Sequence, residues 1–261
     1  MRTQLKLTVL AAAMFLSATA MASPISIDIT SLSASWSAAT PSGVVTYHNS
    51  GTLNPYARWG ESTGSGQSGY NFAAEATPFN ASVNPGYASA LFALGTFEHV
   101  NQPINGSSIS SIDLLYTANV TVDGVAASRN FDFIFNHNET PNGSNPCANG
   151  GPNGFGVNSI GCADHVQTEF SGVSDTFFIN GAEYTLNILG FGYLDINNNL
   201  VKTQDFWTAE IAVNTATLYA KIVTTAEPGG GGLSTIPEPS SLMLMGLGLA
   251  AFLTKRRRQF S

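Results

Sequence analysis

Glu98, His99 and Asn101 bring together side chains of a kind often used to bind ligands. A carboxylate, an imidazole and an amide offer hydrogen-bond donors and acceptors at short spacing. In an extended strand, however, His99 and Asn101 point to one face and Glu98 to the other, so the motif does not converge on one ligand by itself. We therefore expect a buried side-chain network that fixes the following turn at Pro103, and we assign no metal or cofactor.

The two cysteines, Cys147 and Cys162, lie in one long irregular segment, 136–164, which is rich in Gly and Asn. In a protein outside the cytoplasm two such cysteines most simply form a disulfide. Closing a loop of about 16 residues would stabilise the fold by roughly 3 kcal/mol. The alternative is a metal site that adds His137 and His165 to the cysteines, but those intervals match no common zinc pattern.

Enzyme signatures fail for physical reasons. Residues 60–64 fit G-x-S-x-G, but more Gly and Ser follow where a nucleophile elbow needs a helix. Residues 195–199 copy the start of a calcium loop, yet Leu200 stands where that loop needs Gly. Three scattered carboxylates could still pair for glycoside hydrolysis: Glu61, Glu75 and Glu98. The sequence predicts no enzyme, with a glycan-active hydrolase or lyase as the alternative.

The C-terminal segment 237–261 has three parts in fixed order. The tripeptide Pro237, Glu238 and Pro239 precedes an apolar run, 240–253, which is followed by the basic cluster Lys255, Arg256, Arg257 and Arg258. Clustered basic residues stay on the cytoplasmic side of a membrane, so the preceding chain is expected on the far side. The run gives roughly 21 Å of helix, which is short for a hydrocarbon core of about 30 Å. A processing signal is therefore favoured over a single-pass tail anchor.

This tail resembles the PEP-CTERM sorting signal of Gram-negative bacteria, which has the same three parts in the same order. The resemblance implies that an exosortase recognises the tripeptide in the membrane and that the hydrophobic tail is then removed. It also implies an inner-membrane precursor and a product at the cell surface or in the extracellular matrix. Membrane contact is expected only through the C-terminal segment before processing.

The N-terminal segment 1–22 has the layout of a secretory signal peptide. A basic start precedes an apolar stretch and an A-x-A site, which places Sec-dependent cleavage between Ala22 and Ser23. The region 23–225 is long enough for one hydrophobic core. A Gly-rich linker, 226–236, separates it from the sorting segment 237–261.

Charge limits the choice of partner. Residues 23–236 keep four of the ten Lys and Arg residues and sixteen of the seventeen Asp and Glu residues, a formal net charge of −12. Such a surface repels phosphates and anionic lipid, which excludes nucleic-acid binding and peripheral membrane binding as main roles. Neutral glycans, divalent cations and cationic surfaces stay open as partners, although acidic charge also serves solubility alone.

Short alternating runs with Gly and Asn turns predict an antiparallel β-sandwich of jelly-roll type. The clearest hairpins turn at Asp123–Gly124 and at Asn180–Gly181. The continuous apolar run 90–97 predicts a buried strand. A last strand is expected over 209–223, with a bulge near Asn214.

The stretch 94–104 resembles the G-x-F-T-H-x-N-x-P-I signature of the THxN proteins, which are related to choice-of-anchor K domains. His99, Asn101, Pro103 and Ile104 match, whereas Glu98 replaces the Thr of the family signature. Similar segments extend the resemblance over roughly residues 90–222. It implies an exported β-domain, and it carries over no catalytic residue.

Together these patterns predict a noncatalytic surface or biofilm-matrix protein held among exopolysaccharide. The positions of the tryptophans distinguish the hypothesis of a noncatalytic protein from that of a hydrolase. A cleft lined by Trp36, Trp59 or Trp207 beside two carboxylates would favour an enzyme, whereas a filled interior that contains them favours the noncatalytic protein.

Overall fold

The computed structural model describes residues 24–83, 88–122, 124–168, 176–179, 182–194 and 200–224. The predicted signal peptide with its expected cleavage site between Ala22 and Ser23, the predicted linker 226–236 and the segment 237–261 lie outside these residues. So do Asp123, the expected second turn at 180–181 and the calcium-like stretch 195–199. The chain divides into two units, Met1–Pro228 and Gly229–Ser261, and all of the described residues belong to the first.

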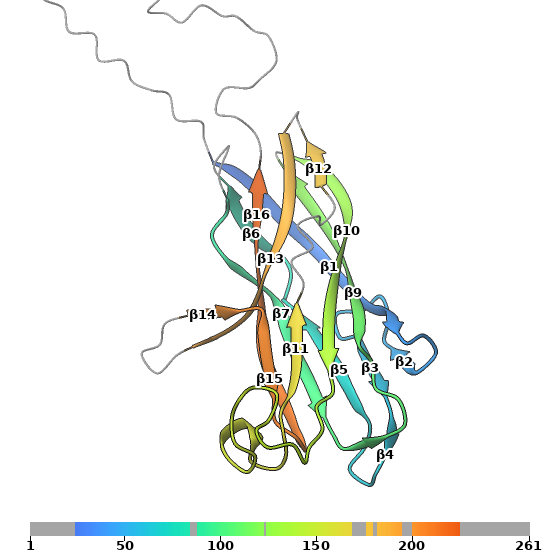
Figure 1. Ribbon diagram of the computed structural model, residues 1–261. Coiled ribbons are helices and arrows are strands. Elements are labelled where there is room, and N and C mark those ends of the chain that lie inside the picture. The colour runs from blue at the N-terminus through green and yellow to red at the C-terminus, as the bar shows by residue number, and fades with distance from the viewer. Residues whose placement is uncertain are drawn as a thin grey trace, which may run out of the picture. The chain divides into compact units, whose positions relative to one another are not determined.

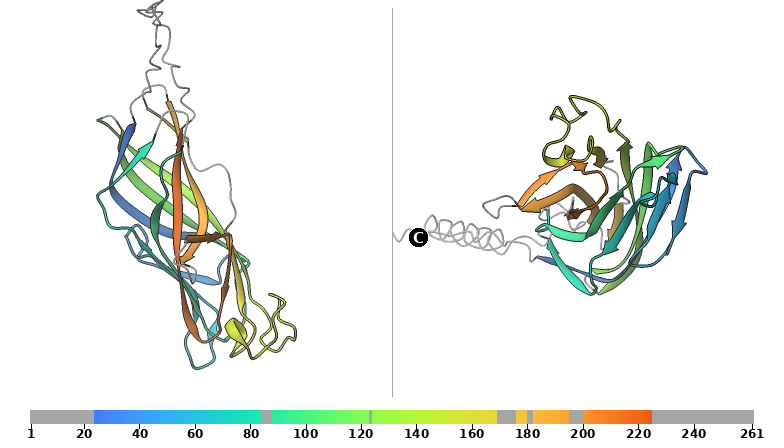
Figure 2. Two further views of the ribbon diagram at one scale, coloured as in Figure 1. Left: turned by 90° about the vertical axis from the view of Figure 1, so that its left-hand side faces the viewer. Right: turned by 90° about the horizontal axis from the view of Figure 1, so that it is seen from below.

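The first unit is built from two antiparallel sheets that face each other across a shared interior (Figure 1; Figure 2, right). One sheet has six strands, in the order β15 (Asp205–Thr208), β11 (Asp164–Thr168), β10 (Val125–Asn138), β9 (Ser111–Val122), β1 (Ile25–Thr40) and β6 (Phe79–Val83). The predicted all-β antiparallel sandwich is confirmed.

The second sheet has eight strands. Its order is β12 (Thr176–Ile179), β13 (Ala182–Leu194), β16 (Ala212–Thr224), β7 (Phe92–Asn101), β5 (Ser68–Ala74), β3 (Tyr56–Trp59) and β2 (Val45–His48), with β14 (Leu200–Thr203) paired to β13. A short ribbon pairs β4 (Glu61–Ser62) with β8 (Ile104–Asn105), and Gly156–Asn158 forms a 3₁₀ turn, η1.

Strict alternation explains why these segments form half-buried strands. In β9, residues 114, 116, 118, 120 and 122 all face the interior, and Phe131, Phe133 and Phe135 face it from β10. Val122 pairs with Val125 across a two-residue connection, and Gly124 has a φ of 78°. Only Gly adopts that angle without strain, so the expected hairpin forms.

An aromatic cluster forms the centre of the interior. Phe97 of β7 is fully buried, and its ring stacks on Phe135 with centroids 5.1 Å apart and planes 6° apart. Tyr70 and Phe191 approach the Phe97 ring at 4.8 and 5.2 Å. Rings from both sheets therefore meet at one point, immediately beside the inward-facing end of β7.

Two expected strands begin later in the chain than the sequence predicted. The buried strand starts at Phe92, and Ala90 and Leu91 are exposed, so the apolar run 90–97 is only partly core. The strand expected from 209 begins at Ala212 because Ala209 is turned back by the Asn214 side chain, which exchanges hydrogen bonds of 2.8 and 2.9 Å with its backbone.

The bulge lies elsewhere than Asn214. Ala216, Leu218 and Ala220 share the buried face, and the register shift falls between Leu218 and Tyr219, opposite Gly95. A Cβ at Gly95 would collide with the carbonyl oxygen of Ala73. The close approach of β5 to β7 therefore requires Gly at this position.

The loop 139–163 joins β10 to β11, and a disulfide between Cys147 and Cys162 closes it. Both cysteines are buried, and Thr140 Oγ1 shares its one hydrogen between the carbonyl oxygens of Cys162 and Ala163, at 3.2 and 2.9 Å. These bonds hold the two ends of the loop together at the lower end of the sandwich in Figure 1.

Replacing both cysteines by serine is expected to lower the free energy of unfolding by roughly 3 kcal/mol, because the open loop gains conformational freedom in the unfolded state. Urea unfolding of the two proteins measures this difference. Peptide mass mapping of the exported wild type under non-reducing conditions should show Cys147 joined to Cys162. Two free thiols in that protein, or zinc bound to them, would contradict the assignment.

Candidate functional site

The polar side chains at the end of strand β7 point to opposite sides of its sheet. His99 and Asn101 are fully buried and face the interior, whereas Glu98 is half-buried and faces outward. The alternation agrees with the expected period of two. The strand therefore contributes to two separate sites: an inner cluster around His99 and an outer groove around Glu98.

The inner cluster starts from His99, whose proton position follows from its neighbours. Nδ1 lies 2.8 Å from Thr208 Oγ1, and that hydroxyl donates its only proton to the carbonyl oxygen of Asp164 at 3.2 Å. Nδ1 must therefore carry the hydrogen and donate it to Thr208, which leaves Nε2 as an acceptor. Among the described residues, no hydrogen-bond partner reaches Nε2. Burial, with a smaller contribution from His137, holds the pKa of His99 well below its usual range, so the ring is neutral.

His137 enters the cluster from β10, in phase with the inward-facing Phe135. Its Nδ1 is 2.7 Å from the Tyr70 hydroxyl, and its Nε2 is 3.3 Å from Glu139 Oε2. Burial raises the pKa of Tyr70 well above its usual range, so the hydroxyl keeps its proton. The two imidazoles lie edge to face with centroids 5.1 Å apart, and each has its Nδ1 occupied by a hydroxyl.

Asp164, the first residue of β11, supplies a buried carboxylate. Oδ1 accepts a hydrogen bond from the backbone N–H of Thr140 at 2.7 Å, while Oδ2 has no partner among the described residues. Burial, together with the nearby Glu139 and Glu210, raises the pKa of Asp164 to about 8. Such a shift shows that the carboxylate charge is poorly compensated by the protein's own groups.

Two further carboxylates complete the cluster. Glu139 is 28 % exposed through its side chain and accepts a hydrogen bond from Ser108 Oγ at 2.8 Å. Glu210 is buried, and burial raises its pKa. In the amide orientation that satisfies both ends of Asn142, its nitrogen donates to Glu210 Oε1 at 3.2 Å. The loop closed by the disulfide thus positions both acids.

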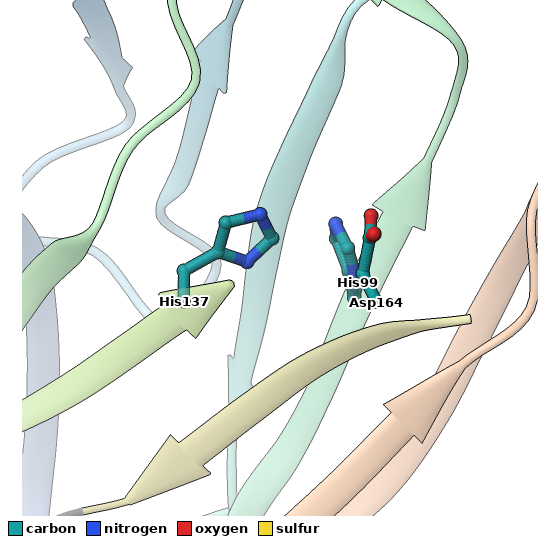
Figure 3. Close-up of side chains that lie close together, drawn as sticks. All are labelled: His99, His137 and Asp164. Atoms are coloured by element: carbon teal, nitrogen blue, oxygen red, sulfur yellow. The ribbon is translucent and has the colours of Figure 1, made fainter. Parts of the chain in front are cut away.

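These side chains fall into two overlapping groups. One ligand atom each from His99, His137 and Asp164 lie within 4.8 Å of one another, and the same holds for Glu139, Asp164 and Glu210. Figure 3 shows the first three converging from β7, β10 and β11. Imidazole nitrogens and carboxylate oxygens at this spacing can hold a divalent cation.

The outer groove has a volume of about 380 Å³ and lies on the solvent side of β3, β5 and β7. A row of hydrogen bonds runs along it: Arg58 Nη2 donates to Asn71 Oδ1 at 2.7 Å, and Asn71 Nδ2 donates to Glu98 Oε2 at 2.8 Å. Arg58 also lies 4.8 Å over the Tyr56 ring, on which His48 stacks at 4.4 Å. The groove offers fixed donors and acceptors to a polar ligand.

The structure does not bring together the two cysteines and two histidines that the sequence offered as an alternative metal site. The cysteines are joined to each other, and His165 pairs instead with Asp205 at 2.8 Å on the exposed edge, which rules out the four-residue metal site proposed as an alternative. The His99 network also differs from the expected one, because its partner is Thr208 rather than the Pro103 turn. That turn is held by Thr63, which donates to Pro103 O at 2.8 Å.

Most of the inner cluster was not predicted from the sequence. Asp164, Glu139 and Glu210 were not singled out, and Tyr70 and Thr208 were not expected as partners of the histidines. One usable signal was present: His99 and His137 each follow a core phenylalanine by two positions, at Phe97 and Phe135, so both had to face the interior. The acids carry no such signal because they lie at the ends of a loop and in a turn.

An antiparallel β-sandwich followed by a Pro-Glu-Pro, apolar and basic tail has the organisation of an exported surface protein. Residues 235–258 match the profile of the PEP-CTERM protein-sorting motif, which confirms the resemblance of the tail and implies export, sorting to the cell surface and processing by an exosortase. No curated protein matches the chain. Within the described residues, no helix has the length and apolarity needed to cross a membrane.

Proposed function

We propose that this protein is a noncatalytic component of the cell surface or biofilm matrix that binds exopolysaccharide through the outer groove. Its sandwich is further proposed to be a THxN-type domain, on the basis of His99, Asn101, Pro103 and Ile104. After processing, an exported domain without its hydrophobic tail needs another means of staying at the surface. Binding to the surrounding glycan supplies one.

The observation that carries this proposal is the polar row from Arg58 through Asn71 to Glu98. Sugar hydroxyls both donate and accept hydrogen bonds, so a groove that fixes guanidinium donors beside carboxylate acceptors suits a neutral glycan. Its volume of about 380 Å³ is within the range of ligand sites. The acidic surface disfavours anionic polymers.

Packing of the interior favours binding over catalysis. Two of the three tryptophans are in the core, since Trp36 and Trp59 are 2 % and 0 % exposed, whereas Trp207 is half-buried and stacks on His165. The apolar cavity between the sheets measures about 20 Å³, room for about one water molecule. Glu75 donates its backbone N–H to the carbonyl oxygen of Leu94, four residues along β7 from Glu98, so the two acids lie at separate positions along the sheet.

Replacing Tyr56 and Glu98 together by alanine is expected to weaken glycan binding about tenfold or more, because both the charged acceptor and the support of Arg58 are lost. Affinity electrophoresis of the exported protein in gels containing deproteinised exopolysaccharide of the producing cells measures binding. Val125→Ala, at an exposed position on the opposite sheet, is the matched control. Wild-type mobility unchanged by the polysaccharide would contradict the proposal, and release of reducing ends would favour the hydrolase.

A further inference from the structure

We propose that the inner cluster is a closed structural site for one divalent first-row transition metal ion, with His99, His137 and Asp164 as ligands and Glu139 and Glu210 beside them. The site lies on the opposite face of β7 from the outer groove. The proposal therefore stands or falls independently of glycan binding.

The histidines have the arrangement of metal ligands. A metal-bound histidine usually directs its second ring nitrogen to a fixed hydrogen-bonding partner, which orients the ring. Here Thr208 occupies Nδ1 of His99 and Tyr70 occupies Nδ1 of His137, so Nε2 is the free nitrogen of His99, whereas Nε2 of His137 lies 3.3 Å from Glu139 Oε2. The Tyr70 hydroxyl can accept as well as donate, so His137 can carry its proton on Nδ1 and leave Nε2 for the ion.

Unpaired buried atoms point to the same place. His99 Nε2 and Asp164 Oδ2 both belong to fully buried residues, and neither finds a hydrogen-bond partner in the described part of the chain. Burying such atoms without a partner is costly, and a cation would satisfy both at once. One ligand atom from each of His99, His137 and Asp164 lies within 4.8 Å of the other two. Tetrahedral ligands about 2.1 Å from zinc lie roughly 3.4 Å apart, so a shift of about 1 Å closes the site.

The acidic side chains of the inner cluster favour a cation as its ligand. Three carboxylates meet at the cluster, and no Lys or Arg forms a salt bridge with any of them among the described residues. Paired imidazoles select zinc, iron or other late transition metals over calcium and magnesium, which prefer oxygen alone. The donor set therefore indicates an ion such as Zn²⁺.

The position of the site indicates a structural role. His99 belongs to the eight-stranded sheet, whereas His137 and Asp164 belong to the six-stranded sheet and flank the disulfide loop. An ion held by all three cross-links the two sheets at the end where the loop leaves them. Full burial of His99 and Asp164 leaves little access for a substrate, as in closed structural sites.

Mature protein recovered from the producing cells without chelators should contain about one equivalent of transition metal by plasma mass spectrometry. After removal of the metal with a chelator, Zn²⁺ should restore the melting temperature, and Co²⁺ should give visible ligand-field absorption. His99→Gln should abolish binding, and Glu139→Gln, at a half-exposed position, should weaken it at least about tenfold. His165→Gln, outside the cluster, should bind as the wild type does.

Metal below a tenth of an equivalent, with no effect of Zn²⁺ on melting of the wild type, would overturn the proposal. Full metal retention by Glu139→Gln together with loss in His165→Gln would overturn it as well, by moving the site to the exposed edge. If His99→Gln fails to fold, the wild-type stoichiometry and the Glu139→Gln affinity still decide. Glycan binding measured on the same samples keeps the two proposals apart.

Discussion

Replacing Pro237, Glu238 and Pro239 together by alanine is expected to leave the precursor in the inner membrane with its hydrophobic tail attached. The two prolines keep the preceding backbone extended and remove amide donors, which suits a segment that must enter a protease cleft rather than continue a membrane helix. The measurement is the C-terminal mass of cell-surface protein, with membrane fractions analysed alongside. Wild-type surface protein should end upstream of the apolar run 240–253.

Deleting Lys255 to Arg258 tests membrane retention of the tail separately from recognition of the tripeptide. Those charges hold the end of the tail in the cytoplasm, so their loss should weaken retention and orientation while the tripeptide stays intact. Wild-type surface protein that still extends to Ser261 would argue for a plain tail anchor. Normal processing of the triple-alanine variant would show that the tripeptide is not the recognised element.

Phe97→Ala is expected to lower the free energy of unfolding by about 3–5 kcal/mol, because it removes a fully buried ring and leaves a cavity. The lost contacts include the stacked ring of Phe135 and those of Tyr70 and Phe191. Urea unfolding with matched slopes measures the change. The metal content of the variant also shows whether metal binding by His99, two residues further along β7, depends on this packing.

The matched control is Phe155→Ala, the same substitution at a side chain that is 70 % exposed in the disulfide loop. It should change the free energy of unfolding by less than about 0.5 kcal/mol. Equal effects of the two substitutions would mean that the ring cluster around Phe97 is not the stabilising centre of the sandwich.

Local sequence was enough to predict the antiparallel sandwich and the main hairpin. Alternation in 111–122 and the phenylalanines at 131, 133 and 135 fix which side of each strand is buried, and a Gly in the turn fixes where the chain reverses. The errors arose where tertiary contacts decide. The start of β16 depends on the Asn214 side chain, and the register shift depends on how closely β5 approaches Gly95.

The inner cluster could be predicted only in part. The alternation of side chains along β7 and β10 predicts that His99 and His137 face the interior, but it does not predict that the two rings contact each other. Their meeting requires the two sheets to pack face to face, and Asp164 joins them only because β11 pairs with β10. Long-range pairing of this kind leaves no mark on residue spacing.

The back-to-back placement of Glu98 and His99 has a consequence for how this chain can change in length. Removing or adding one residue at 96–97, between the register shift opposite Gly95 and Glu98, would reverse the orientation of every side chain after it, since this part of the strand repeats every two residues. Glu98 would then enter the aromatic interior, while His99 would leave Thr208 and face solvent. Relatives that keep both faces should therefore tolerate substitutions in β7 far better than insertions or deletions of a single residue.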